Sequence, residues 1–579
     1  MLLKNCHCFS QQFPELKWQK SFGGTNEDYA YFIEKTNQGG YIACGTTNSN
    51  NGDLTTNYGQ YDGLIIKLNS AGNKEWQKSL GGSQIDNFTC IRQTSDNGYV
   101  AIGGSSSNDG DIIGNHGQSD TWIVKLKPTG ELQWSKSFGG SMAEYGLSIQ
   151  QTFDKGFIAG SESYSNDGDV LGNHGNNDFW ILKLDTSGNI EWQKMLEGSN
   201  NDYLKYIEQT SNSGFIAVGY TFSNDGDVSG AHNSTGVNAD CWIIKLDKRG
   251  NLQWQKTLEG SYGDIAYSVE ETFDHGYIIA GSSASTNGDI TINYGGSDCW
   301  IIKLTNAGSI SWQKTYGGNL SDVGRFIRQT SDSSYIVAGY SKSNNGNVSF
   351  NHGGNDIWIF KIDTSGNLQW EKSFGGSNDE ICTTILQNTN GEFVYAGYSA
   401  SNNGDISGNH GGNDFCLMKL TTAVTICSGV DSNVFIANSY NSSNVYQWQM
   451  DSGTGFTNIS NNTYYSGTTA DTLLIINVST SWYGYKYRCQ ITNSGNIFFT
   501  DPFILKFGVK WTGTQSNEWN NPANWSCSNI PDENTDVIIP TGLINYPVLT
   551  FNTTIKSLDV SSGAYITVSD GITLLITGL

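Results

Sequence analysis

The chain is short of proline and of charged residues. Only 7 of its 579 residues are proline and 15% are charged, against about 25% charged residues in a typical domain. This composition excludes collagen-like chains and coiled coils. No run reaches the roughly 18 apolar residues of a membrane-crossing helix, so we expect no membrane span. The first ten residues hold no apolar run of signal-peptide length, so we expect either that the chain is cut short there or that its export is not encoded here.

Basic residues are also scarce. Lys and Arg total 32 against 55 Asp and Glu, which gives a net charge of −23 at pH 7. A chain this acidic repels the phosphates of nucleic acids and anionic membrane surfaces. The arginines are Arg92, Arg249, Arg325, Arg328 and Arg488. We therefore expect no nucleic-acid partner.

Glycine and aromatic residues are abundant instead. There are 70 glycines, and 12% of the residues are aromatic. Aromatic and β-branched stretches favour strands, and the Asn, Asp, Ser and Gly clusters between them favour turns. The predicted fold class is all-β.

A tryptophan recurs at a nearly constant spacing through most of the chain. The interval is 58 residues, except for one of 62. The recurring residues are Trp18, Trp76, Trp134, Trp192, Trp254, Trp312 and Trp370. Each unit holds four strand patterns, for example at residues 203–210, 214–220, 241–246 and 252–258. Four antiparallel strands per ~60 residues predict a β-propeller; a β-solenoid, which has shorter coils, is the alternative.

The two ends of the repeat region complement each other. Residues 380–388, 392–399 and 414–420 form three strand patterns without a fourth, and residues 16–22 form a fourth pattern without the other three. Pairing 16–22 with 414–420 would remove the open edges of a linear array. We therefore predict a seven-bladed propeller over residues 1–422, closed by the N-terminal strand.

Lysines recur on two strands of every unit. They are Lys20, Lys78, Lys136, Lys194, Lys256, Lys314 and Lys372 on the fourth strand, and Lys67, Lys125, Lys183, Lys245, Lys303, Lys361 and Lys419 on the third. Lysine on a sheet edge discourages pairing with other sheets. We interpret all of them in this way, not as a binding patch.

Carboxylates also recur at fixed positions. One set follows the Gly-Gly turn: Asp28, Asp86, Glu144, Asp202, Asp264, Asp322 and Glu380. A second lies in the Asn-Asp-Gly-Asp segment: Asp53, Asp111, Asp169, Asp227, Asp289 and Asp405, with Asn347 in the remaining unit. A third opens the third strand: Asp62, Asp120, Asp178, Asp240, Asp298, Asp356 and Asp414. Most of these strand-opening residues follow an Asn-His-Gly or Asn-Tyr-Gly triplet.

All three sets should lie on one face of the propeller, because the loops that carry them emerge there. The favoured interpretation is loop capping, since Asx side chains accept backbone N–H bonds readily. The alternative is a Ca²⁺ site in each loop, because carboxylates and amide carbonyls suit calcium. The loops lack the later bidentate Glu of an EF-hand. No other cofactor is expected, and the dispersed histidines favour a loop role over a zinc site.

Signatures of enzymes are missing. The chain contains no G-x-S-x-G, H-E-x-x-H or P-loop motif. A sialidase would need an arginine triad, and Arg92, Arg325 and Arg328 fall in only two units. These arginines nevertheless break the symmetry of the repeat, so they would line the pocket of a polysaccharide-binding or polysaccharide-degrading propeller. No catalytic residue is predicted.

A different pattern begins near residue 423. Cys427, Trp448 and Cys489 stand in the order of an immunoglobulin-like sandwich, predicted over residues 423–508. A Cys427–Cys489 disulfide fits this spacing and would require an oxidising compartment; two reduced, buried cysteines are the alternative. The single cysteines of the repeats are interpreted as small buried hydrophobic residues: Cys44, Cys90, Cys241, Cys299, Cys382 and Cys416.

Residues 509–579 predict a small β-rich module, a sandwich or a solenoid, whose pattern runs to the last residue. Two alternatives stay open: the module is incomplete and the chain is a fragment, or the module ends here. Trp511, Trp519 and Trp525 are expected to pack beneath a short sheet; stacking on sugar rings is the alternative.

Several segments together resemble a known group of proteins. W-Q-K-S-F-G-G, S-N-D-G-D-V-S-G and W-I-I-K-L are similar to the ~60-residue propeller repeats of secreted bacterial surface proteins. Y-K-Y-R-C-Q and W-N-N-P-A-N-W resemble modules of the same multidomain proteins, many of them exported by the type IX system. The resemblance implies a secreted or cell-surface protein and no catalytic residues. Three display-type domains without a catalytic constellation favour a non-enzymatic extracellular adhesion or scaffolding protein with a protein or glycan ligand.

Overall fold

The computed structural model describes residues 13–54, 56–173, 176–231, 238–388, 391–426, 433–436, 445–476, 478–493, 496–500, 502–526, 528–540, 543–560 and 564–578. Over these residues the chain is built of β-strands, with two short 3₁₀ helices at Thr480–Trp482 and Pro522–Asn524. The predicted all-β class is therefore confirmed. No helix within these ranges is long and apolar enough to cross a membrane. The chain divides into two compact units, each described separately below.

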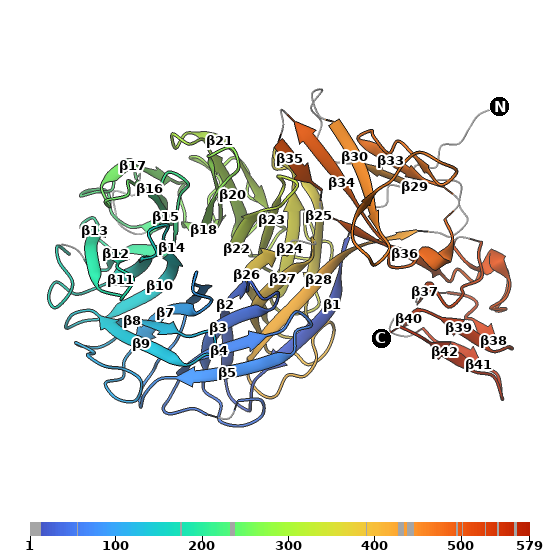
Figure 1. Ribbon diagram of the computed structural model, residues 1–579, viewed down its shortest axis with the longest axis horizontal. Coiled ribbons are helices and arrows are strands. Elements are labelled where there is room, and N and C mark those ends of the chain that lie inside the picture. Colours follow the sequence, from blue (N-terminus) through green and yellow to red (C-terminus); the bar gives the residue numbers. More distant parts are fainter. Residues whose placement is uncertain are drawn as a thin grey trace. The chain divides into compact units, whose positions relative to one another are not determined.

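The unit formed by Leu16–Asn388 and Phe393–Leu420 is a seven-bladed propeller (Figure 1). The innermost strands are β2 (Asp28–Lys35), β6 (Cys90–Gln93), β10 (Glu144–Gln151), β14 (Asp202–Gln209), β18 (Asp264–Glu271), β22 (Asp322–Gln329) and β26 (Glu380–Gln387). The second strands are β3 (Tyr41–Thr47), β7 (Tyr99–Ser105), β11 (Phe157–Ser163), β15 (Phe215–Thr221), β19 (Tyr277–Ser283), β23 (Tyr335–Ser341) and β27 (Phe393–Ser399).

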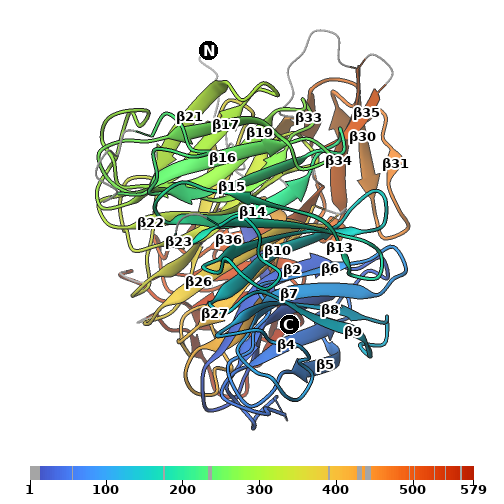
Figure 2. The same cartoon turned by 90° about the vertical axis from the view of Figure 1, so that its left-hand side faces the viewer.

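The third strands are β4 (Asp62–Leu68), β8 (Asp120–Leu126), β12 (Asp178–Leu184), β16 (Asp240–Leu246), β20 (Asp298–Leu304), β24 (Asp356–Ile362) and β28 (Asp414–Ile426). The outer strands are β5 (Lys74–Leu80), β9 (Leu132–Phe138), β13 (Ile190–Leu196), β17 (Leu252–Leu258), β21 (Ile310–Tyr316), β25 (Leu368–Phe374) and β1 (Phe13–Phe22). Blades 1 to 6 are consecutive in the chain, from β2–β5 to β22–β25. Blade 7 consists of β26, β27, β28 and β1. Figure 2 shows β14, β15 and β16 of blade 4 side by side.

The first and last repeats close the ring. The N-terminal β1 pairs with β28, so that it supplies the outer strand of blade 7. The Gln19 side-chain amide donates to Ser407 O at 3.0 Å, and Asp28 N donates to Asn413 O at 2.7 Å. Closure gives β28 an outer neighbour and completes a fourth strand for blade 7, as in the other blades.

The recurring tryptophan joins each blade to the next. Trp18 of blade 7 packs edge-on against Tyr41 of blade 1, with ring centroids 6.2 Å apart. Trp76 of blade 1 meets Tyr99 of blade 2 in the same way at 5.9 Å. Gly72 lies against Trp18 with a φ of +81°, and a Cβ there would come within 2.9 Å of the indole ring. Both the conformation and the contact therefore demand glycine.

The lysines of the third strands correct one prediction. Lys67, Lys125, Lys183, Lys245, Lys303, Lys361 and Lys419 are buried. The Lys125 ammonium donates to Leu126 O at 3.1 Å and pairs with Asp96 in a turn at 2.9 Å. The third strand is paired on both sides, so these residues are not on a sheet edge. Their stems lie in the core while the charged ends reach the turns.

The second unit contains the β-rich region that follows the propeller. One sheet holds β30 (Val445–Asp451), β31 (Thr457–Asn458), β34 (Lys486–Asn493), β35 (Asn496–Phe499), β36 (Phe503–Lys510) and the end of β28. The other holds β29 (Asn433–Ile436), β32 (Tyr465–Ser466) and β33 (Thr472–Ile475). Trp448 lies opposite Cys489 in the β30–β34 register, and both are buried. Cys489 is a free thiol, and Cys427 lies outside the described residues, so the disulfide remains a prediction.

The last strands pair in parallel. They are β37 (Thr535–Ile539), β38 (Val548–Leu549), β39 (Thr553–Ile555), β40 (Ser557–Val560), β41 (Thr567–Val568) and β42 (Leu574–Ile576). Partners are offset by 19 to 21 residues in the pairs β37–β40, β38–β41 and β39–β42. Parallel pairing at a short, constant offset is typical of a solenoid. Trp511, Trp519 and Trp525 are buried against one another beneath these strands, as the packing interpretation predicted.

The closure of the ring predicts a large effect of removing β1. A chain that begins at residue 23 loses the buried Phe22 and the half-buried Trp18, together with the pairing of β28. Burial of two such side chains stabilises by at least about 3 kcal/mol, so we expect the melting temperature to fall by roughly 6 °C or more. The control is a chain that begins at residue 13 and keeps β1. Equal melting temperatures for the two chains would contradict closure by β1.

Candidate functional site

The carboxylates that recur in the sequence gather where adjacent blades meet. The strand-opening residues Asp62, Asp120, Asp178, Asp240, Asp298, Asp356 and Asp414 are buried. The loop residues Asp53, Asp111, Asp169, Asp227, Asp289 and Asp405 are half-buried. All lie at the same end of the blades, since each loop folds onto the turn that precedes the innermost strand of its own blade.

The carboxylates after the Gly-Gly turn hold that turn against the next loop. Asp28 accepts bonds from Gly24 N at 2.9 Å, from the Thr47 hydroxyl and from the Ser49 hydroxyl at 2.8 Å. The loop aspartates bond to the same turn: Asp111 accepts from Gly81 N at 3.2 Å, and Asp405 from Gly375 N at 3.3 Å. These bonds satisfy backbone donors inside each blade.

The strand-opening aspartates connect neighbouring blades through histidine. Asp356 accepts from His352 N at 2.7 Å, and the His352 Nδ1 atom lies against the same carboxylate. The other imidazole nitrogen, Nε2, lies 3.6 Å from Asp405 of the next blade. His410 makes the corresponding bridge between Asp414 and Asp53; His174 and His232 lie outside the described residues. Within the described residues, no group of three or more His, Cys, Asp or Glu is arranged to hold a metal, and calcium remains a prediction.

Several strand-opening aspartates face a second carboxylate across a glycine. Asp62 and Asp86 both flank Gly81, and Asp298 and Asp322 both flank Gly317. The Oδ1 atoms of Asp62, Asp120, Asp298, Asp356 and Asp414 are buried and accept no hydrogen bond from the described chain. Burial, reinforced by the neighbouring carboxylate, raises the pKa of Asp62 to about 6 and that of Asp298 to about 7. Asp62 and Asp298 therefore hold protons close to neutral pH.

A different set of residues lines the central channel, and sequence reasoning missed most of it. The innermost strands alternate between buried and half-exposed residues. Because successive innermost strands contact one another around the ring, their half-exposed residues face the channel. The register shifts after the third residue of these strands, for example between Ala30 and Phe32. Such a bulge turns the extra residue away from the ladder.

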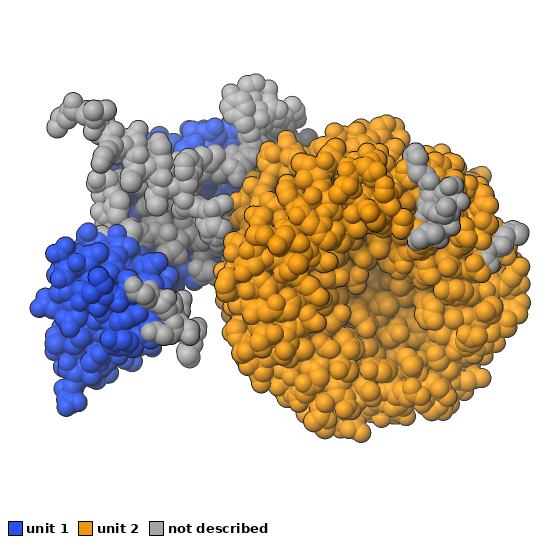
Figure 3. Space-filling view, turned by 180° about the vertical axis from the view of Figure 1, so that it is seen from behind, with its two compact units in different colours: residues 1–15, 389–392, 421–579 blue, residues 16–388, 393–420 orange. Residues whose placement is uncertain are grey.

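Tyrosine recurs at the second and fourth positions of the innermost strands. These channel residues are Tyr29, Tyr31, Tyr145, Tyr203 and Tyr267. The second strands add Tyr220, Tyr340 and Tyr398, which are also half-exposed. We call these eight residues, together with Lys205 and Arg325, the tyrosine mouth. Figure 3 shows the hollow at the centre of the propeller unit.

One side of the tyrosine mouth is an ordered group of rings and charges. The rings of Tyr203 and Tyr220 stack with centroids 4.8 Å apart. Lys205 lies over both rings, 5.6 and 5.3 Å from their centroids, and pairs with Glu162 at 3.1 Å. Burial raises the pKa of Glu162, although Lys205 and Asn177 oppose the shift.

The other side holds Arg325. Its guanidinium lies 4.6 Å from the centroid of the Tyr267 ring. Across the mouth, Tyr29 packs edge-on against Tyr398 with centroids 4.8 Å apart and donates its hydroxyl to Glu27 at 2.8 Å. The mouth therefore offers flat aromatic faces, phenol hydroxyls and two cations, Lys205 and Arg325.

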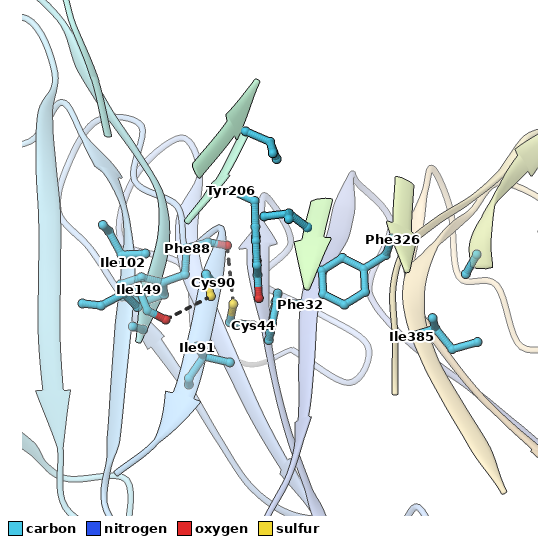
Figure 4. Packing of buried hydrophobic residues seen from close by; sticks show 14 of the residues in the cluster. Phe32, Cys44, Phe88, Cys90, Ile91, Ile102, Ile149, Tyr206, Phe326 and Ile385 are labelled. Atoms are coloured by element: carbon cyan, nitrogen blue, oxygen red, sulfur yellow. Dashed lines mark hydrogen bonds between the residues drawn. The ribbon is translucent and has the colours of Figure 1, made fainter. Parts of the chain in front are cut away.

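Arg92 and Arg328 lie deeper and close the channel. Both donate to the hydroxyl of Tyr206, Arg328 at 2.8 Å, so the three side chains link blades 2, 4 and 6. Phe32 and Phe326 pack beside them, and Figure 4 shows these rings next to Tyr206.

Glutamates neutralise both of these deep arginines. Arg92 pairs with Glu34 at 3.1 Å, and Arg328 lies 3.8 and 3.9 Å from Glu208 and Glu270. Of the three arginines that break the repeat, only Arg325 belongs to the open mouth.

Comparison with known proteins gives short or distant matches. Residues 510–579 match the model of a domain of unknown function, DUF8693. The regulatory protein FlaEY of Caulobacter vibrioides is 27% identical over 163 residues, which are 26% of this chain. The chain spans 17% of the length of that relative.

Two solved structures show a remote likeness. The crystal structure of puromycin hydrolase has a TM-score of 0.38 at 9% identity and covers 65% of this chain and 51% of its own. The structure described as "Structural basis for Dscam isoform specificity" has a TM-score of 0.13 at 9% identity, with 65% and 81% covered.

The paired carboxyls predict a stability that falls as the pH rises. The pKa values of Asp62 and Asp298 are higher in the folded chain than the ordinary value of about 3.9, so the folded state binds their protons more tightly. Their contribution is complete below about pH 4 and is lost as the pH passes 6 to 7. We expect the melting temperature to fall between pH 5 and pH 8. Asp298→Asn should flatten this slope and melt roughly 2–4 °C higher than the wild type at pH 8.

Glu131→Gln, at an exposed carboxylate, is the matched control and should keep the wild-type slope. A melting temperature that rises across this range, or a slope unchanged by Asp298→Asn, would contradict the account. The same assay at pH 8 tests for calcium. If Ca²⁺ binds at these pairs, the melting temperature will be higher with Ca²⁺ than with chelator.

Proposed function

We propose that the chain is a non-enzymatic adhesion protein that acts outside the cell or on its surface and binds glycan at the tyrosine mouth. One observation carries the proposal: half-exposed tyrosines from several blades converge at the centre of the propeller. Buried aromatic rings are ordinary core residues, whereas a ring of partly open ones exposes apolar surface that a ligand would cover.

The chemistry of the mouth suits sugars. A pyranose has apolar C–H faces and equatorial hydroxyls, so it stacks on a flat ring while bonding to nearby polar groups. Tyr203 and Tyr220 present stacked rings, and Tyr29 and Tyr398 present an edge-to-face pair. Burial raises the pKa of Tyr29 to about 12, so its hydroxyl stays protonated.

An extracellular location is part of the proposal. It is supported by the resemblance of the repeats to secreted surface proteins, many of them exported by the type IX system. The β-rich unit after the propeller supports it as well, because such units serve as spacers in display proteins.

A polysaccharide-degrading enzyme is the second candidate. Glycoside hydrolysis needs a proton donor with a raised pKa and usually a second carboxylate beside it. Glu162 is a buried carboxyl with a raised pKa next to Tyr203 and Lys205. Its two oxygens are already engaged by Lys205 and Asn177, which favours a structural role.

A glycan array with the purified chain tests the proposal. The mouth variant Tyr203→Ala/Tyr267→Ala should lose at least about tenfold in affinity for any glycan bound, since stacking on each ring contributes about 1 kcal/mol. The matched control is Tyr262→Ala, at a tyrosine that is 58% exposed on a loop; it should bind as the wild type does.

Three outcomes would contradict the proposal. The first is that the mouth variant binds glycan as tightly as the wild type. The second is that the array shows no glycan binding while the mouth captures a protein. Release of new reducing ends from a bound polysaccharide, abolished by Glu162→Gln, would instead show the enzyme.

A further inference from the structure

Arg325 is a cation without a partner. Within the described residues, its guanidinium makes no hydrogen bond and no ion pair; its contact is the face of Tyr267 at 4.6 Å. The residue is half-buried. In a chain with a net charge of −23, carboxylates are plentiful, so an unpaired arginine inside the channel calls for an explanation.

The other channel cations differ from Arg325 in this respect. Arg92 and Arg328 each have glutamate and Tyr206 as partners. Lys205 pairs with Glu162 at 3.1 Å. Their charges are neutralised inside the protein, whereas the charge of Arg325 remains available.

The groups around Arg325 are hydrogen-bond donors. Burial raises the pKa of Tyr31, Tyr340 and Tyr398, and the charge of Arg325 opposes the shift in all three, which places the guanidinium within electrostatic range of each. Within the described chain, the hydroxyls of these three tyrosines and of Tyr267 have no hydrogen-bond partner. Phenols with raised pKa values stay protonated. A cation and four free O–H groups thus gather without a carboxylate bonded to them.

Such a set of donors fits an oxyanion. Guanidinium binds carboxylate and sulfate through two parallel N–H bonds, and charge-assisted bonds are stronger than neutral ones. The ring of Tyr267 holds one face of the guanidinium, so its edge remains free for a ligand.

We propose that Arg325 binds an oxyanion of the sugar ligand, a uronic-acid carboxylate or a sulfate ester, with the surrounding tyrosine hydroxyls as further donors. The proposal rests on the glycan-binding function above and names its substrate class: an acidic polysaccharide. The acidic surface of the chain repels such a polymer at long range, so binding depends on this local contact.

Titration calorimetry with the full chain tests the proposal, using polygalacturonate, dextran sulfate and unmodified dextran as probes. We expect at least one acidic polymer to bind at least about tenfold more tightly than dextran, and the preferred one identifies carboxylate or sulfate. Arg325→Gln should lower that affinity at least about tenfold, because a charge-assisted bond contributes about 1.5–3 kcal/mol. Arg325→Lys keeps the charge but not the paired geometry, so it should bind with intermediate affinity.

Arg249→Gln is the matched control, since Arg249 lies in an exposed turn and carries the same charge; it should bind as the wild type does. A wild-type melting temperature for Arg325→Gln shows that this variant keeps the fold. If Arg325→Gln unfolds, Arg325→Lys serves as the test instead.

Four results would overturn the proposal. The first is that dextran binds as tightly as the acidic polymers, and the second is that Arg325→Gln keeps full affinity. If the tyrosine variant still loses glycan binding in either case, the proposed function stands and this inference fails. The third is that poly-glutamate competes for the site as well as the acidic polysaccharide does, which would show that the protein recognises negative charge alone. The fourth is that no glycan binds in the array or in titration calorimetry, in which case both proposals fail.

Discussion

The contact between the tryptophan of one blade and the turn of the next is the constraint on which the propeller depends. Each such tryptophan packs against an aromatic residue on the second strand of the following blade. All of them except Trp370 also lie against a glycine in the turn between the third and fourth strands of that blade. A larger residue than glycine would push the indole away. The 58-residue spacing of tryptophan and the glycine of the turn therefore recur together, and Trp18 carries the contact across the closure.

This constraint divides the residues of a repeat into two groups. Positions at the blade junctions vary little, since the junctions share most of their contacts, and the recurring aspartates belong there. Positions that face the channel touch no junction and are free to differ. The bulge that six of the innermost strands carry adds one such position to each of those blades. In four of them it is occupied by Tyr31, Lys205, Tyr267 or Arg325. Symmetry thus holds the scaffold, and departures from symmetry form the site.

The sequence predicted the role of residues that recur in every repeat. It did not predict the role of residues whose function depends on how deep they lie in the channel. The tryptophan spacing predicted seven blades and the closing strand. The lysines of the third strands were wrongly assigned to an edge, because a strand pattern does not reveal that both neighbours are paired. Arg325 and Arg328 are three residues apart, yet one lies in the open mouth and the other in the closed floor. The tyrosines match an ordinary strand pattern in the sequence, and only the structure shows that their strands line the channel.

The most direct measurement is a crystal structure of the chain with an acidic oligosaccharide, such as a tetragalacturonate. The account predicts sugar density in the channel, with a ring stacked on a tyrosine of the mouth and a carboxylate within about 3 Å of the Arg325 guanidinium. Sugar bound on the outer rim, on the aspartate loops or on the C-terminal strands, with Arg325 untouched, would contradict it.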